Sequence, residues 1–81
     1  MYYVYVLKSE KNGKQYIGYT EDLEVRILAH NSGKVRSTKA YRPYKVIYKE
    51  EYENKTLARK RENFFKSGQG RIQLQNKLCM L

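Results

Sequence analysis

Two short runs of strand-forming residues lie close together near the start of the chain, and they limit the folds open to it more than any other feature. The runs are Tyr2–Leu7 and Tyr16–Thr20, both rich in tyrosine and β-branched residues. Asn12 and Gly13 lie between them, and an Asn-Gly pair favours a two-residue type I′ turn. The sequence therefore predicts an antiparallel β-hairpin.

A two-residue turn would also fix the register of this hairpin. It would place Tyr5 opposite Thr20, and it would put Tyr5 and Tyr16 on the same face of the sheet. The two tyrosines would then be separated by about 13 Å at ~3.3 Å per residue. Only strand twist and side-chain reach would bring their hydroxyls toward a common point.

The acidic residues that follow the second strand indicate the start of a helix. We predict a helix from about Asp22 to Ser32, with Thr20 as its N-cap and Gly33 as its stop. Its buried stripe would follow the spacing of Leu23, Ile27 and His30, and Arg26 would lie beside the stripe one turn before His30.

The second half of the chain predicts one more strand and two more helices. The strand spans about residues 44–52, the first helix residues 54–66 and the second residues 71–81. The predicted buried positions are Tyr44, Val46 and Tyr48 on the strand, Leu57, Ala58, Arg61, Phe64 and Phe65 on the first helix, and Leu74, Leu78 and Leu81 on the last. The order ββαβαα predicts a single α+β domain over residues 1–81 with a small three-stranded sheet.

Positive charge is concentrated in two blocks, and the chain carries a net charge of +9. Residues 34–45 hold five cations and no acid, and residues 55–81 hold seven cations and one acid. Such an excess indicates an anionic partner, most often nucleic acid, although a solvated basic surface is the plainer alternative. The candidate nucleic-acid-binding residues are Lys14, Lys34, Arg36, Lys39, Arg42, Arg59, Lys66 and Arg71.

Several classes of protein are excluded by what the sequence lacks. The single cysteine, Cys79, rules out an internal disulfide and a cysteine-based metal cluster. No run of ~18–20 apolar residues and no secretory signal pattern is present, so we expect a cytoplasmic protein with no membrane association. No Ser-His-Asp or Cys-His layout and no phosphate-binding glycine loop is visible.

A small set of polar residues remains as candidates for chemistry. They are Tyr5, Tyr16, Arg26, His30 and Glu62. Hydrolysis of a phosphodiester needs a group that activates the nucleophile, a cation that stabilises the transition state and usually a divalent ion held by a carboxylate. These five side chains could supply all three.

The order of these residues resembles the GIY-YIG nuclease domain over nearly the whole chain. The landmarks are Tyr3-Val4-Tyr5, Tyr16-Ile17-Gly18, Arg26, His30 and Glu62. The sequence is most similar to small stand-alone members, the UPF0213-like group, akin to the catalytic domain of the excinuclease C subunit and to intron homing endonucleases. The resemblance implies a three-stranded antiparallel sheet flanked by helices, and divalent-metal-dependent cleavage of DNA. Gly18 would leave room for a backbone to approach the site.

The resemblance also implies a role for each residue. Tyr5 and Tyr16 match the paired motif tyrosines, one of which helps to activate water or to shield developing charge. Arg26 matches an arginine that contacts the scissile phosphate, and His30 matches a position near the nucleophile. Glu62 matches the carboxylate that holds a single metal ion, Mg²⁺ or Mn²⁺.

Three positions depart from the family pattern. Tyr3 replaces the first glycine of the motif, Tyr19 stands where excinuclease-type domains carry a lysine, and Leu74 stands near the position of a late asparagine, for which Asn76 is a loose match. Two alternatives to a nuclease therefore stay open: a catalytically decayed nucleic-acid-binding module of the same fold, and a domain that docks on acidic proteins. RNA as the ligand, a homodimer and a targeting partner protein are also compatible with the sequence.

Overall fold

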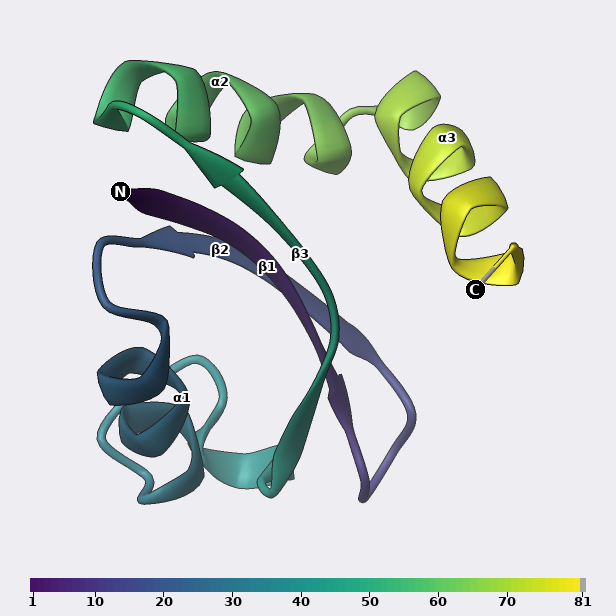
Figure 1. The fold of residues 1–81 in the computed structure, drawn as a ribbon. Helices are drawn as coiled ribbons and strands as arrows, with labels where there is room; N and C mark the ends of the chain where they lie inside the picture. The colour runs from purple at the N-terminus through teal and green to yellow at the C-terminus, as the bar shows by residue number, and fades with distance from the viewer. Residues whose placement is uncertain (81) are drawn as a thin grey trace.

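The computed structural model describes residues 1–80, and Leu81 with its predicted buried position lies outside the described residues. The elements are β1 (Tyr2–Ser9), β2 (Gln15–Thr20), α1 (Leu23–Asn31), a short 3₁₀ turn (Lys39–Tyr41), β3 (Tyr44–Tyr52), α2 (Lys55–Lys66) and α3 (Gly68–Cys79). The strands form one antiparallel sheet in the order β2-β1-β3. In Figure 1, α1 lies on one side of this sheet and α2 on the other. The predicted α+β class and the order ββαβαα are confirmed.

The register of the β1–β2 hairpin differs from the predicted one by two residues. Tyr5 lies opposite Gly18 instead of Thr20, and Leu7 lies opposite Tyr16. Tyr5 and Tyr16 do share a face, as predicted, but they are only two positions apart along it. Their ring centroids are therefore 6.5 Å apart, well inside the separation that the predicted register implied.

The loop between these strands explains the difference. The Ser9 hydroxyl accepts hydrogen bonds from the backbone N–H groups of Lys11 and Asn12, at 3.1 and 3.2 Å. A type I′ turn needs positive φ at both central residues, but here only Gly13 has a positive φ, of 73°. The buried Ser9 side chain thus stabilises a longer loop that competes with the Asn-Gly turn.

Helix α1 begins one residue later than predicted. The Asp22 side chain, and not that of Thr20, caps the helix, because it accepts from the backbone N–H of Val25 at 3.2 Å. The Thr20 hydroxyl instead accepts from the backbone N–H of Asp22. Gly33, with a φ of 83°, follows the C-cap as predicted.

Strand β3 has the predicted bounds but a different distribution of side chains. Val6 of β1 faces Tyr48, while the next residue of β1 faces Val46, so Ile47 is an extra residue in a β-bulge. Tyr44 and Val46 pack on the α1 side, whereas Ile47 and Tyr48 pack on the α2 side. The prediction of one shared face for Tyr44, Val46 and Tyr48 was therefore wrong.

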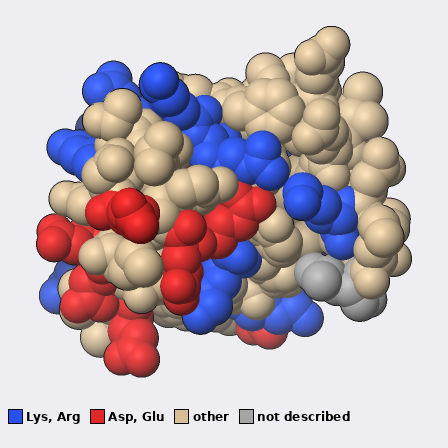
Figure 2. Space-filling model, turned by 45° about the horizontal axis from the view of Figure 1, so that its top comes forward, with Lys and Arg blue, Asp and Glu red and all other residues tan. Residues whose placement is uncertain are grey.

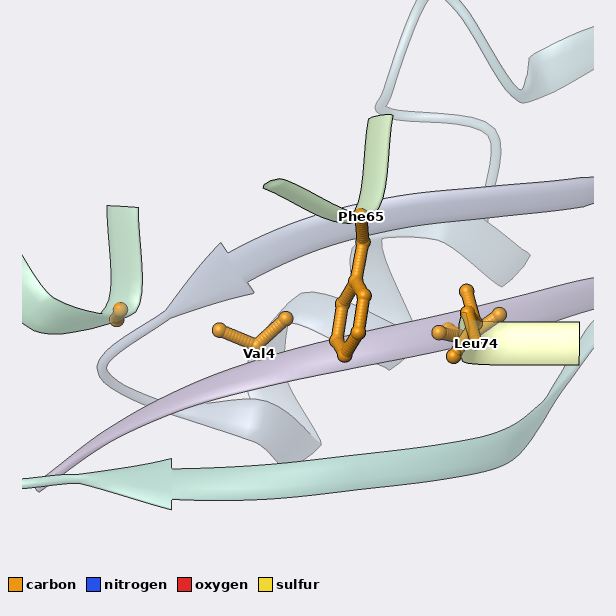
Figure 3. Close-up of a cluster of buried hydrophobic side chains, with 5 residues drawn as sticks. Val4, Phe65 and Leu74 are labelled. Atoms are coloured by element: carbon orange, nitrogen blue, oxygen red, sulfur yellow. The ribbon is translucent and has the colours of Figure 1, made fainter. Parts of the chain in front are cut away.

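Two hydrophobic clusters lie on the two faces of the sheet. The larger consists of Val4, Val6, Ala58, Phe65 and Leu74 under α2 and α3 (Figure 3). The smaller consists of Tyr5, Leu7 and Tyr44 under α1. Because side chains alternate along β1, this one strand supplies both clusters.

The helices after β3 also differ in detail from the prediction. Leu57 is exposed and does not belong to the buried stripe of α2. Helix α3 starts at Gly68, earlier than predicted, because the Ser67 hydroxyl accepts from the backbone N–H of Gly70 and caps it. A Cβ atom at Gly70 would collide with the Phe64 carbonyl oxygen, so glycine is required where α2 meets α3. Across residues 1–80 the structure contains no helix that is both long and apolar enough to cross a membrane.

Candidate active site

The Tyr5 side chain lies beneath β2 on the α1 side of the sheet. It is buried, and a Cβ atom at Gly18 would lie 2.5 Å from its hydroxyl oxygen. Gly18 is therefore needed to make room for the Tyr5 hydroxyl, a different role from the predicted one of admitting a ligand backbone. Gly18 and Tyr5 therefore pack directly against each other.

A chain of hydrogen bonds runs from the edge of the site into the interior. The Tyr5 hydroxyl is 3.4 Å from Arg26 Nε and 3.0 Å from His30 Nε2. His30 Nδ1 is 2.7 Å from the Thr38 hydroxyl. The sequence predicted that Tyr5, Arg26 and His30 would contribute to one site, and the structure brings these three side chains into direct contact.

His30 is enclosed by side chains from every neighbouring element. Its ring lies 4.9 Å from that of Tyr16 and 6.3 Å from that of Tyr44, centroid to centroid. Burial, with a smaller contribution from the Arg26 charge, lowers the pKa of His30 to about 4. The imidazole is therefore neutral near pH 7, and it is too deeply buried to contact a ligand directly.

Tyr5 and Arg26 also have shifted pKa values. Burial raises the pKa of Tyr5, although the hydrogen bond and charge of Arg26 oppose the rise. The hydrogen bond to Tyr5 raises the pKa of Arg26 further above its usual range. Near neutral pH the site therefore consists of a protonated phenol, a neutral imidazole and a guanidinium ion.

The Arg26 guanidinium has no carboxylate partner among the residues that the structure describes. In residues 1–80 the two ion pairs join Arg61 to Glu50 and Lys66 to Glu62. Arg26 is partly exposed, and its side-chain hydrogen bond goes to the neutral Tyr5 hydroxyl. A half-buried positive charge held by a neutral partner is well placed to bind an anion.

Tyr16 is the more accessible motif tyrosine, and it borders a groove. One shallow groove of about 240 Å³ is lined by Tyr16, Lys66 and Arg71, among others. An adjoining groove of about 310 Å³ is lined by Lys14 and Arg71. Three of the predicted nucleic-acid-binding cations thus converge beside Tyr16, where the edge strand β2 faces the junction of α2 and α3.

Glu62 lies on α2, one turn before Lys66, which lines this groove. Its carboxylate is 3.4 Å from Lys66 Nζ, and its side chain is 13% exposed. It also contributes slightly to the raised pKa of Tyr5. Within residues 1–80 no group of three or more His, Cys, Asp or Glu side chains is arranged to hold a metal ion. A metal ion at Glu62 would therefore need ligands from water and from a bound substrate.

The other predicted cations are exposed but lie away from this groove. Lys34, Arg36, Lys39 and Arg42 occupy the segment between α1 and β3, and Arg59 lies on α2. In Figure 2, the side of the molecule where α3 lies shows Lys and Arg but no acidic side chain, while acidic side chains gather toward the opposite side. On this face of the molecule the acidic side chains are therefore confined to one side, where Lys and Arg also occur.

Thr38 is the residue of this site that sequence reasoning missed. It is fully buried and hydrogen-bonds His30 from the segment between α1 and β3. That segment has no hydrophobic period, and its neighbouring cations indicated only an exposed basic loop. No local pattern distinguishes a buried threonine there, so only the three-dimensional contact reveals it.

The chain is similar to a known family of proteins in sequence and in fold. Residues 1–76 match the family described as the GIY-YIG catalytic domain. A UPF0213 protein from Staphylococcus haemolyticus is 38% identical over 81 residues, which cover 99% of this chain and 93% of that protein. A UPF0213 protein from Clostridium perfringens is 45% identical over 67 residues, 82% of this chain and 71% of that one. The solution NMR structure of a UPF0213 protein from Bacillus halodurans is similar with a TM-score of 0.56 and 32% identity, over 94% of this chain and 84% of that one.

Proposed function

The chain belongs to the GIY-YIG catalytic-domain family, and on this premise we propose that it is a divalent-metal-dependent endonuclease that hydrolyses phosphodiester bonds in DNA. The observation that carries the proposal is the state of Arg26. Its guanidinium is held by the neutral Tyr5 hydroxyl beside the accessible Tyr16, with no carboxylate to neutralise it among residues 1–80. A scissile phosphate is the anion that this arrangement fits.

Arg26 would act on the transition state of hydrolysis. Negative charge accumulates on the non-bridging oxygens of the phosphate as the nucleophile attacks, and a cation already fixed in position stabilises that charge without reorganising. The partly buried setting of Arg26 strengthens the interaction, because less water screens it. Arg26 is therefore proposed as the catalytic residue that contacts the phosphate.

Burial divides the remaining polar residues into two groups. Tyr16 is partly exposed and borders the groove, so its hydroxyl is the one that can contact a substrate or a water molecule. Tyr5 and His30 are almost fully buried, so we assign them to holding Arg26 in place. This assignment sharpens the family-based expectation, which left open which of the two tyrosines faces the reaction.

Glu62 is the residue proposed to hold Mg²⁺ or Mn²⁺. Mg²⁺ commonly binds through one or two carboxylates and completes its shell with water and substrate phosphate oxygens, which suits a site with a single carboxylate. Such an ion, when bound, would neutralise charge on the phosphate. Lys66, which pairs with Glu62 here, would have to release the carboxylate and would remain beside the groove as a phosphate ligand.

The DNA backbone is proposed to follow the groove beside Tyr16. Lys66 and Arg71 line it, Lys14 lines the adjoining groove, and all three present positive charge, which suits a sequence-independent track for phosphates. The cations of the segment between α1 and β3 would add contacts outside the groove. Because these contacts address phosphates, the proposal includes no base-specific recognition.

The test is a cleavage assay with Glu62→Gln as the principal variant. Labelled single-stranded, duplex, flapped and branched DNA, together with RNA, are incubated with the protein in Mg²⁺, in Mn²⁺ and in EDTA. We expect metal-dependent cleavage by the native chain, and loss of cleavage with retained DNA binding in Glu62→Gln. Glu53→Gln is the matched control, because Glu53 is exposed just before α2 and should leave cleavage unchanged.

Two outcomes would contradict the proposal in different ways. Undiminished cleavage by Glu62→Gln would show that Glu62 holds no essential metal. Binding without cleavage under every condition would favour the second candidate, a non-catalytic nucleic-acid-binding module. The burial of Leu74 favours that candidate, because a core residue occupies the place near which the family pattern has an asparagine.

A further inference from the structure

The hydrogen-bonded chain that starts at Arg26 has two ends whose chemistry is fixed. An arginine side chain can only donate hydrogen bonds, and a backbone carbonyl can only accept them. At the outer end Arg26 Nε–H donates to the Tyr5 hydroxyl oxygen over 3.4 Å. At the inner end the Thr38 hydroxyl donates to the Val35 carbonyl oxygen over 3.3 Å.

These two ends determine every hydrogen between them. Since the Thr38 hydrogen points to Val35, the Thr38 oxygen accepts from His30, so His30 carries its proton on Nδ1. His30 Nε2 is then unprotonated, and its lone pair accepts a hydrogen bond from the Tyr5 hydroxyl. The Tyr5 oxygen therefore presents a lone pair to Arg26.

The opposite tautomer would break the chain at both ends. A proton on His30 Nε2 would be donated to the Tyr5 oxygen, and the Tyr5 hydrogen would then have no acceptor, because both partners of this hydroxyl, His30 Nε2 and Arg26 Nε, would be donors. The bare Nδ1 would also take the Thr38 hydrogen away from Val35. All these side-chain groups are buried except Arg26, so a missing partner carries a substantial cost.

From this geometry we infer that Thr38 is a positioning residue: its hydroxyl fixes the Nδ1–H tautomer of His30, and through Tyr5 this tautomer orients the Arg26 guanidinium. Thr38 itself is fully buried and touches no substrate. The part of the inference that concerns cleavage rests on the proposed function. The part that concerns the tautomer stands on the hydrogen bonds alone.

The tautomer can be observed directly, because His30 is the only histidine of the chain. Long-range ¹H–¹⁵N correlation spectra of the native chain near pH 7 report which ring nitrogen carries the proton. We expect a protonated Nδ1 and an unprotonated Nε2. A protonated Nε2 in the native chain would overturn the inference without any variant and without any cleavage assay.

Two variants then test the role of the hydroxyl. Thr38→Val keeps the shape but removes the hydroxyl, and we expect a mixture of tautomers or the Nε2–H form. Thr38→Ser keeps the hydroxyl and should restore the native spectrum. If Thr38→Val retains the native spectrum, Thr38 does not fix the tautomer.

Cleavage by the same variants tests the link to Arg26. By analogy with partners that orient metal ligands, whose loss costs about 10–100-fold in activity, we expect a fall of that size in kcat for Thr38→Val and near-native kcat for Thr38→Ser. A fall in kcat with the native tautomer would mean a merely structural role and would contradict the inference. If the native chain cleaves nothing, the proposed function fails, while the spectra still decide the tautomer.

Discussion

An arginine lies on each face of the sheet, and the two differ in the charge of their hydrogen-bond partners. On the α2 side, Arg61 binds both carboxylate oxygens of Glu50, at 2.9 and 3.3 Å, and lies 4.3 Å above the Phe65 ring. On the α1 side, Arg26 donates to the neutral hydroxyl of Tyr5. The Arg61 charge is neutralised within the fold, whereas the Arg26 charge is left available for a ligand.

The tyrosines around the two arginines differ in the same way. Tyr48 and Tyr52 donate to the Glu50 carboxylate, at 2.6 and 2.5 Å, and burial together with that carboxylate raises the pKa of each to about 12. Tyr5 instead meets the neutral imidazole of His30. The network around Arg61 neutralises its own charges and stabilises the fold. The neutral partners of Arg26 leave its charge available to bind a ligand.

The first prediction separates the two arginines by activity. We expect Arg26→Ala to lower kcat about 10²–10³-fold, as removal of one fixed donor to a transition-state oxyanion does. Arg61→Ala should leave the rate per folded molecule unchanged. Initial rates over a range of DNA concentrations measure kcat and KM for both variants, and a rise in KM alone for Arg26→Ala would make Arg26 a binding residue instead.

The second prediction concerns acid and the His30 side of the sheet. The pKa of His30 is about 4 in the folded chain and about 6.5 when unfolded, so below pH 6.5 the unfolded state takes up a proton that the folded state does not. The stabilisation is complete above pH 6.5 and is lost as the pH falls toward 4, by about 3 kcal/mol at ~1.4 kcal/mol per pH unit. Urea unfolding between pH 7 and 4 measures it.

His30→Gln is the control for this titration. The variant lacks the ionisable ring, so its free energy of unfolding should lose the steep fall between pH 6.5 and 4. Burial would raise the pKa of Glu50, but the hydrogen bonds from Arg61, Tyr48 and Tyr52 outweigh it and hold that pKa below its usual range. The Glu50 contribution is therefore lost at lower pH than that of His30, and an equal fall in both proteins would refute the assignment.

The sequence predicted the bounds of the helices and strands more accurately than the register and the faces of the strands. The bounds of β3 followed from its strand-forming composition after Pro43, and they proved correct. The hairpin register was wrong because Ser9, a residue before the turn, captures two backbone N–H groups of the loop. The faces of β3 were wrong because the bulge at Ile47 reverses the alternation. Both errors come from local irregularities, a loop two residues longer than the predicted turn and a one-residue bulge, that periodicity does not detect.

The residues of the site differ in the same way: those on regular elements could be predicted, and those on irregular segments could not. Residues that lie on regular elements, such as Tyr5, Arg26 and His30, could be assigned to one site from spacing and resemblance, and the structure brings them together. Thr38 and the grouping of Lys14 with Arg71 could not, because both depend on irregular segments whose course is set by long-range packing. The corner between α2 and α3, which requires Gly70, decides where Arg71 points.

The third prediction tests the network around Arg61 by stability. Arg61→Ala leaves Glu50 with two tyrosine donors but no compensating charge, and it removes the cation from the Phe65 ring. Breaking a fully buried pair costs more, but these side chains are partly exposed, so we expect about 2 kcal/mol. For a domain of this size that lowers Tm by roughly 10 °C, measurable by thermal unfolding.

Arg26→Ala is the comparison for this third measurement. Its hydrogen bond to the Tyr5 hydroxyl is long, at 3.4 Å, and only part-buried, so it should contribute about 1 kcal/mol to stability, less than the Arg61 network. The two substitutions therefore show opposite patterns: one mainly affects the rate of cleavage and the other mainly affects Tm. Equal losses of stability would mean that Arg26 is as much a part of the fold as Arg61, and the distinction between the two faces would fail.

The fourth prediction concerns the weakest interactions, those of the groove. Arg71→Ala should raise the Kd for DNA about fivefold, near 1 kcal/mol, and reduce the slope of log K against log salt by about 1, because one phosphate contact is lost. Lys77→Ala is the matched control, since Lys77 lies on the same helix but does not line the grooves beside Tyr16. Fluorescence anisotropy in EDTA measures binding without cleavage. If both variants weaken binding equally, the cations act only through net charge, and Arg26 would then be the one positive group whose position matters.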